Sequence, residues 1–108
     1  MFDGGARELS QSLEVGMIVS VLKMRAKSPE AAREICRIFS EWRSLSIEAG
    51  WLRCSCLTNV KDRQEVYVHE HWGNLAAWEA WERSASRQAL FRQLAPLLEG
   101  PVELDIYD

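Results

Sequence analysis

The chain has 108 residues, a length that suits one domain with a single hydrophobic core rather than two domains. Its 13 basic and 16 acidic residues give a net charge of -3, and lysine and arginine form no cluster able to neutralise several phosphates, so we expect no nucleic-acid partner. Apolar runs fall short of the ~20 residues of a membrane span, and residues 1–16 lack the apolar centre of a secretory signal, so we expect a cytoplasmic protein with no membrane partner.

We expect residues 1–16 to form an N-terminal extension with no assigned role, and residues 17–108 to form the folded domain. The three cysteines fit the expected compartment, because their odd number and their spacing give no disulfide framework. We therefore predict reduced thiols.

The segment of residues 17–26 predicts a strand with two apolar faces. Met17, Val19 and Val21 fall on one side, and Ile18, Leu22 and Met24 fall on the other. One helical layer covers only one face of a sheet, so the second face needs another sheet, which in a chain of this length most plausibly belongs to a second copy. The pattern predicts a homodimer.

A helix is expected to follow, beginning at Ser28-Pro29-Glu30. Gly50 stands where a C-terminal cap is expected. Apolar residues recur between these points at helical spacing, which predicts an amphipathic helix that packs on the sheet: Ile35, Ile38, Phe39, Trp42, Leu45 and Ala49.

The remaining elements complete an α+β chain. Residues 51–60 and 65–72 predict an antiparallel hairpin with a loop of three to four residues. Helices are expected over residues 74–83 and 86–98, and residues 102–107 alternate as a closing strand does. The order β-α-β-β-α-α-β predicts a ferredoxin-like fold, a four-stranded antiparallel sheet with helices on one face.

Three of the five tryptophans lie within ten residues, at Trp72, Trp78 and Trp81. Trp72 ends a strand, and the other two share one face of a helix, so all three could line a cavity for a flat ligand. The alternative is plain core packing, because each buried indole contributes several kcal/mol at about 25 cal/mol/Å². The sequence leaves both interpretations open.

Histidines and cysteines also alternate on the predicted hairpin. His69 and His71 share one face of their strand, which predicts hydrogen bonding across a dimer, with general-base work as the alternative. In one hairpin register Cys54 and Cys56 would lie opposite them and offer four zinc ligands, but a shift of one residue moves the cysteines to the other face. We predict no metal site, and we predict a packing role for Cys36.

Several features of the second half of the chain fall in a fixed order. They are Glu70 and Trp72 at the strand end, Asn74 at the helix start, Trp78, Ser84, Leu90-Phe91, and Leu94 with Leu97 and Leu98. In this order they resemble the antibiotic biosynthesis monooxygenase (ABM) family over residues 17–108. The resemblance implies ferredoxin-like subunits that pair into a dimeric α+β barrel, in agreement with the homodimer that the first strand predicts.

The family resemblance implies several chemistries. It includes cofactor-free oxygenases that turn phenols or quinols into quinones, haem-degrading enzymes, and small proteins without an established reaction. Trp72 and Arg92 match a tryptophan and an arginine that position substrate in the quinone-forming members, although Val68 replaces a polar amide there. Trp81 matches the haem-degrading members, but their strand asparagine and their histidine ligand are missing, so we expect no haem and no other cofactor.

Without a cofactor, the substrate itself must be an electron-rich anion that reacts with molecular oxygen. The protein must deprotonate it, keep it dry and donate hydrogen bonds to the peroxide that forms. We assign catalysis to Trp72, Arg92 and His71, and substrate binding to Glu70, Trp78, Trp81 and Phe91, with Glu70 as an alternative base. The leading prediction is a cofactor-independent monooxygenase oxidising an aromatic quinol or phenol to a quinone. The alternative is a dimeric barrel protein, non-catalytic, that binds small molecules or is associated with stress.

Overall fold

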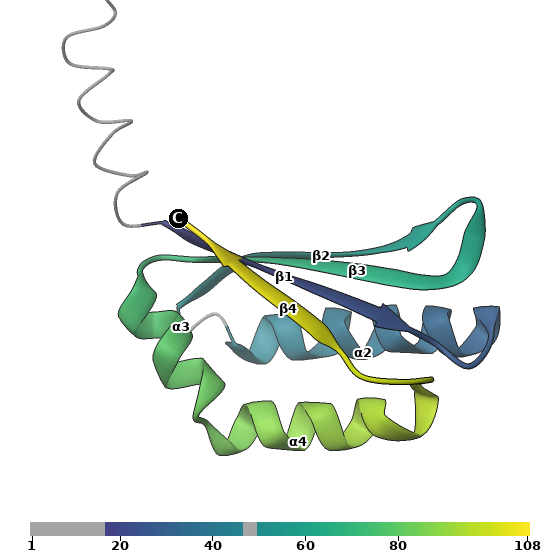
Figure 1. Cartoon of the computed structure of the whole chain (residues 1–108). Coiled ribbons are helices and arrows are strands. Elements are labelled where there is room, and N and C mark those ends of the chain that lie inside the picture. Colours follow the sequence, from purple (N-terminus) through teal and green to yellow (C-terminus); the bar gives the residue numbers. More distant parts are fainter. Residues whose placement is uncertain (1–16, 47–49) are drawn as a thin grey trace, which may run out of the picture.

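The structure is a computed structural model and describes residues 17–46 and 50–108 (Figure 1). The predicted extension, residues 1–16, lies outside the described residues. The elements in chain order are β1 (Ile18–Arg25), α2 (Pro29–Ser46), β2 (Trp51–Asn59), β3 (Asp62–Trp72), α3 (Leu75–Glu82), α4 (Ala85–Leu94), the 3-10 helix η2 (Ala95–Leu97) and β4 (Glu103–Tyr107). The predicted order is confirmed, with η2 as an addition.

The four strands form one antiparallel sheet in the order β2-β3-β1-β4. The helices α2, α3 and α4 all lie on the same side of this sheet (Figure 1). This is the predicted ferredoxin-like arrangement. We call the sheet face that the helices cover the inner face, and the opposite face the outer face.

The first strand divides its side chains between these faces as its alternation predicts. Ile18, Leu22 and Met24 are buried on the inner face, whereas Val19 and Val21 on the outer face are partly exposed. The core therefore lies between the inner face and the helices. Its largest fully buried side chains are Trp72, Phe39, Ile35, Leu90, Leu94, Val66 and Val68.

The connection between β2 and β3 is shorter than predicted. Only Val60 and Lys61 form the turn, so β3 begins at Asp62 rather than at residue 65. The polar residues there pair instead of looping out, because the Gln64 side chain donates to the carbonyls of Ala26 at 3.0 Å and Lys27 at 3.2 Å. These contacts, together with the pairing of Asp62 with Asn59 of β2, extend a strand that sequence polarity alone would end.

The start of α2 follows the predicted signal, and the helix ends at Ser46, before the predicted cap position at Gly50. The Ala31 N–H donates to Ser28 Oγ at 3.0 Å, which is an N-cap hydrogen bond. Gly50 has a φ of +92°, and a Cβ there would lie 2.7 Å from Ala77 Cβ, so the position demands glycine. Leu45 and Ala49, two of the predicted inward positions, lie outside the residues whose side chains the structure describes.

The last helix ends earlier than predicted. Pro96 has no N–H to continue the ladder, so α4 ends at Leu94 and the chain tightens into η2. Over the described residues, we find no helix with the length and apolar character that a bilayer crossing requires.

Candidate active site

A chain of two hydrogen bonds crosses the inner face beneath the helices. Trp72 Nε1 donates to Ser20 Oγ at 3.0 Å, and Ser20 Oγ donates to Glu70 Oε1 at 2.7 Å. The pairing of β1 with β3 builds this arrangement, because Ser20 lies directly opposite Glu70 in the register. We call Ser20, Glu70 and Trp72 the inner-face network.

Glu70 is a buried carboxyl group, with 3% of its surface exposed. Burial raises its pKa from 4.5 to about 7, because a carboxylate loses its hydration inside the fold. The hydrogen bond from Ser20 and the positive charge of Arg87 oppose this shift. Glu70 can therefore take up or release a proton near neutral pH, which is the property that a general acid or base needs.

Arg87, which the sequence interpretation missed, is the cation that acts on Glu70. It lies in the first turn of α4, and its guanidinium carbon stands 4.3 Å from the centre of the Phe91 ring. Arg87 shares the helix face of the buried Leu90 and Leu94, at spacings of three and seven residues. That spacing is the signal that could have identified it.

Arg92, the predicted arginine, lies elsewhere on the same helix. It is exposed in the last turn of α4, away from the buried stripe. A step of one residue turns a helical side chain by about 100°, so Arg92 and Phe91 face different directions. The structure brings Phe91 to Arg87 rather than to Arg92.

The tryptophans occupy three different environments. Trp72 is fully buried, and Trp81 is 5% exposed with its ring centre 5.9 Å from that of Trp72. Trp78 is half-buried and packs against the core from α3. Trp72 and Trp81 therefore fill the core, and of the three only Trp78 offers substantial surface to a ligand in this conformation.

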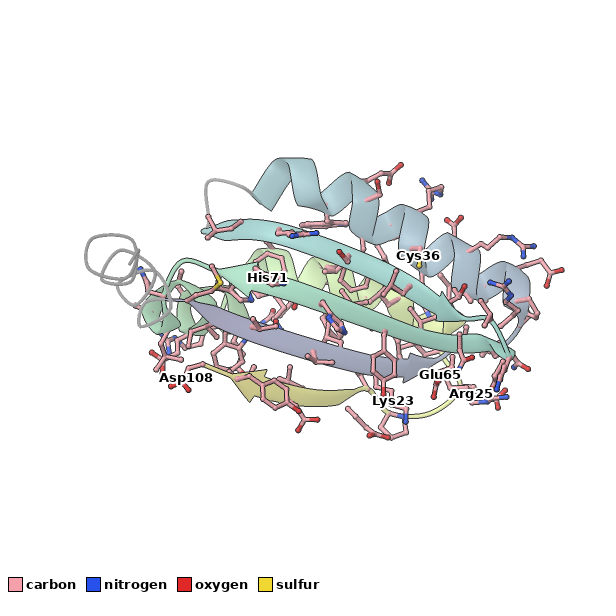
Figure 2. The ribbon with its side chains drawn as sticks, turned by 90° about the horizontal axis from the view of Figure 1, so that it is seen from above. Lys23, Arg25, Cys36, Glu65, His71 and Asp108 are labelled. Carbon is pink, nitrogen blue, oxygen red and sulfur yellow. The ribbon has the colours of Figure 1, made fainter. Side chains whose placement is uncertain are left out.

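His71 lies on the outer face, as predicted (Figure 2). Tyr67 and His69 share this face. It is therefore separated by the sheet from Glu70 and Trp72, its neighbours in sequence. Partial burial, with the charge of Arg53, lowers the pKa of His71 below 6.5. The structure does not bring His71 together with the inner-face network.

The hairpin register places the cysteines on the inner face. Cys54 lies opposite Glu70, and Cys56 lies opposite Val68, so neither shares a face with His69 or His71. The four-ligand zinc arrangement is therefore absent. Within the described ranges 17–46 and 50–108, no group of three or more His, Cys, Asp or Glu side chains could hold a metal ion.

Comparison with known proteins identifies the class. The fold is a ferredoxin-like α+β domain, and the sequence pattern of the family described as "Antibiotic biosynthesis monooxygenase" matches residues 17–93. The chain belongs to this family. No curated protein matches the chain.

Solved structures share the fold at low sequence identity. A conserved protein from Methanosarcina mazei Go1 has a TM-score of 0.76 and 17% identity, over 90% of this chain and 96% of that one. SnoaB, a cofactor-independent oxygenase from Streptomyces nogalater, has a TM-score of 0.73 and 13% identity, over 86% and 92%. Rv0793 from Mycobacterium tuberculosis has a TM-score of 0.69 and 13% identity, over 85% and 93%. At these identities the likeness defines the fold and not the reaction.

Proposed function

We propose that the protein is a cofactor-independent monooxygenase that oxidises an aromatic phenol or quinol to a quinone. Membership of the family and the likeness to SnoaB support an oxygenase. The observation that carries the proposal is Glu70, a buried carboxyl group whose pKa of about 7 suits it to accept a phenol proton at neutral pH.

Glu70 acts as the base in this proposal, and Ser20 and Trp72 position it. The hydrogen bond from Ser20 fixes one carboxylate oxygen, and Trp72 fixes Ser20. Deprotonation gives an electron-rich phenolate, which can transfer electrons to molecular oxygen without a cofactor. For a phenol with a free ring position, one oxygen atom enters the ring and the other leaves as water.

Arg87 supplies the positive charge of the proposed site. It lies close enough to lower the pKa of Glu70, and the same charge can stabilise a phenolate or a peroxide anion. Phe91, in contact with Arg87, and the half-buried Trp78 are candidates to contact an aromatic ring. Because Glu70 is 3% exposed, substrate reaches it only when partly exposed neighbours such as Arg87 move.

The other predicted site residues take secondary roles in the proposal. Trp81 holds Trp72 by ring packing. Arg92, exposed on α4, is a candidate to attract an anionic substrate, and His71 is a candidate for contacts between two copies of the chain. We do not place either in the proton transfer.

A second copy is the proposed partner of the outer face. Leu57 on β2 and Tyr107 on β4 are each 56% exposed there, and Tyr107 lies beside the partly exposed Val19 of β1. Exposed apolar side chains among the polar ones of a sheet face favour a covering partner. Sedimentation at micromolar concentration should give a dimer, and a well-folded monomer would contradict this part of the proposal.

One observation favours the second candidate, a non-catalytic protein that binds small molecules. Trp72 has no exposed surface, so no ligand can stack on it in this conformation. A binding protein would be stabilised against heat by aromatic compounds without consuming oxygen.

An oxygen electrode distinguishes the two candidates. Wild-type protein should consume oxygen with hydroquinones and simple phenols, and Glu70→Gln should lower the rate by about 10²–10⁴-fold, because glutamine keeps the shape but cannot accept the proton. Arg92→Ala and His71→Ala serve as matched controls and should lower it much less. Thermal stabilisation without oxygen uptake would support the binding protein, and an active Glu70→Gln variant would exclude Glu70 as the base.

A further inference from the structure

All three cysteines of the chain line one cavity between α2 and β2. The cavity has a volume of about 190 Å³, and its lining is Cys36, Phe39, Ser40, Cys54 and Cys56. Each of the three cysteines is partly exposed, and none forms a disulfide. Figure 2 places Cys36 on α2 beside the sheet.

The fold explains why these residues meet. Cys54 and Cys56 are two apart on β2, so both project from the inner face toward α2. Cys36, Phe39 and Ser40 are spaced three and four residues apart on α2, which places them on one helix face. Alternating residues of β2 and one face of α2 therefore line the same cavity.

Two of the thiols that line the cavity affect each other's pKa. A hydrogen bond between the Cys36 and Cys56 side chains lowers the pKa of Cys36. The same hydrogen bond with Cys36 raises the pKa of Cys56, and burial and the nearby Cys54 and Glu70 raise it further. Of the two thiols, Cys36 therefore loses its proton more readily, and the thiolate is the nucleophilic form.

We propose that Cys36 and Cys56 form a peroxide-reactive thiol pair, in which Cys36 attacks the oxidant and Cys56 resolves the product into a disulfide between α2 and β2. Two considerations on geometry support this. The cavity gives a small oxidant access to both thiols. The set of residues does not suit a metal, because the described part of the chain contains no group of three such ligands with metal-binding geometry.

The chemistry balances with hydrogen peroxide as the oxidant. The Cys36 thiolate attacks one peroxide oxygen, the O–O bond breaks, and hydroxide leaves, so Cys36 becomes a sulfenic acid. The Cys56 sulfur then displaces the sulfenic oxygen, which leaves as water with the Cys56 proton, and an S–S bond of about 2.05 Å forms. Two thiols are oxidised, and one peroxide is reduced to two waters.

Peptide mapping after treatment with hydrogen peroxide tests the proposal, with no quinol present, so the result is independent of the proposed oxygenase activity. Wild-type protein should form a Cys36–Cys56 linked peptide within one chain, and dithiothreitol should reverse it. Cys54→Ser is the matched control and should form the same link. Cys56→Ser should stop at a sulfenic acid on Cys36 that dimedone traps.

Cys36→Ser should react with peroxide at least about tenfold more slowly than wild type, and Cys36→Ala gives a second test of the same thiol. Circular dichroism verifies that each variant is folded before its rate is compared. A link that uses Cys54, links only between chains, or an unchanged rate in folded Cys36 variants would overturn the proposal.

Discussion

The two faces of the sheet differ sharply although the same strands build both. On the inner face, Ser20, Glu70 and Trp72 are buried and joined by hydrogen bonds. On the outer face, His71 and Tyr67 are at least partly exposed. Glu70, His71 and Trp72 are consecutive in sequence, yet the strand sends them to different environments. Neighbouring residues of a strand therefore need separate functional interpretations.

Burial shifts the pKa of Glu70 and the pKa of His71 in opposite directions. It raises the pKa of Glu70 to about 7, and it lowers the pKa of His71 below 6.5. Both effects favour the neutral form of each group, because desolvation penalises charge. Glu70 differs in its partners: it accepts a hydrogen bond from Ser20 and lies near the positive charge of Arg87, and both favour its charged form. This makes the inner face the better place for proton transfer.

The largest expected effect is that of Trp72→Ala on stability. Trp72 is fully buried and donates a hydrogen bond, so its loss leaves a cavity and an altered network, at a cost of about 3–5 kcal/mol in the free energy of unfolding. His71→Ala, one residue away on the outer face, should cost about 1 kcal/mol or less. Urea unfolding measures both, and equal losses would break the contrast between the faces.

The second effect is a pH dependence that belongs to Glu70. Its pKa is raised from 4.5 to about 7 on folding, so the native state holds a proton that the unfolded state has lost between these values. Stability should fall as pH rises through this window, by roughly 3 kcal/mol at 1.36 kcal/mol for each pKa unit. Glu70→Gln should remove this fall, and urea unfolding between pH 4 and pH 8 would reveal it. A variant profile parallel to that of wild type would contradict the assignment.

The third effect compares two serines on opposite faces. Ser20→Ala removes the donor to Glu70 and the acceptor of Trp72, so it should cost about 1–3 kcal/mol and raise the pKa of Glu70 further. Ser55→Ala, half-buried on the outer face opposite His69, should have little effect. The unfolding midpoint in urea distinguishes them.

The smallest effect is expected for an ion pair of the outer face. Lys23 Nζ lies 3.5 Å from Glu65 Oε2, with both side chains partly exposed in the single chain. Water and salt screen such a pair, so Lys23→Ala should leave the urea midpoint nearly unchanged. A large shift at low salt would mean that the outer face is more shielded than the isolated chain shows.

The order of elements could be predicted because local signals determine it. Ser28 marks the start of α2 by its own chemistry, and the alternation of β1 separates its faces. The start of β3 could not be predicted, because Gln64 reaches carbonyls at the end of β1 that only the folded chain brings near.

The candidate site was predicted only in part. The sequence predicts that Glu70 and Trp72 lie at the end of a strand. It does not reveal that Ser20 lies opposite Glu70, because strand register depends on the folded sheet. The face of Cys54 depended on a loop length that one residue changes, so the sequence left it open. Arg87 was predictable in principle, because it shares a helix face with Leu90 and Leu94, whereas Arg92 does not.

The most direct test of the account is the titration of the Glu70 side chain, followed by carbon NMR of its carboxyl group in the folded protein. The assignment is made by comparison with Glu70→Gln. The account predicts a midpoint near pH 7, with the neutral acid present below it. A midpoint near pH 4.5, the ordinary value, would contradict the account, because Glu70 would then be a poor proton acceptor at neutral pH.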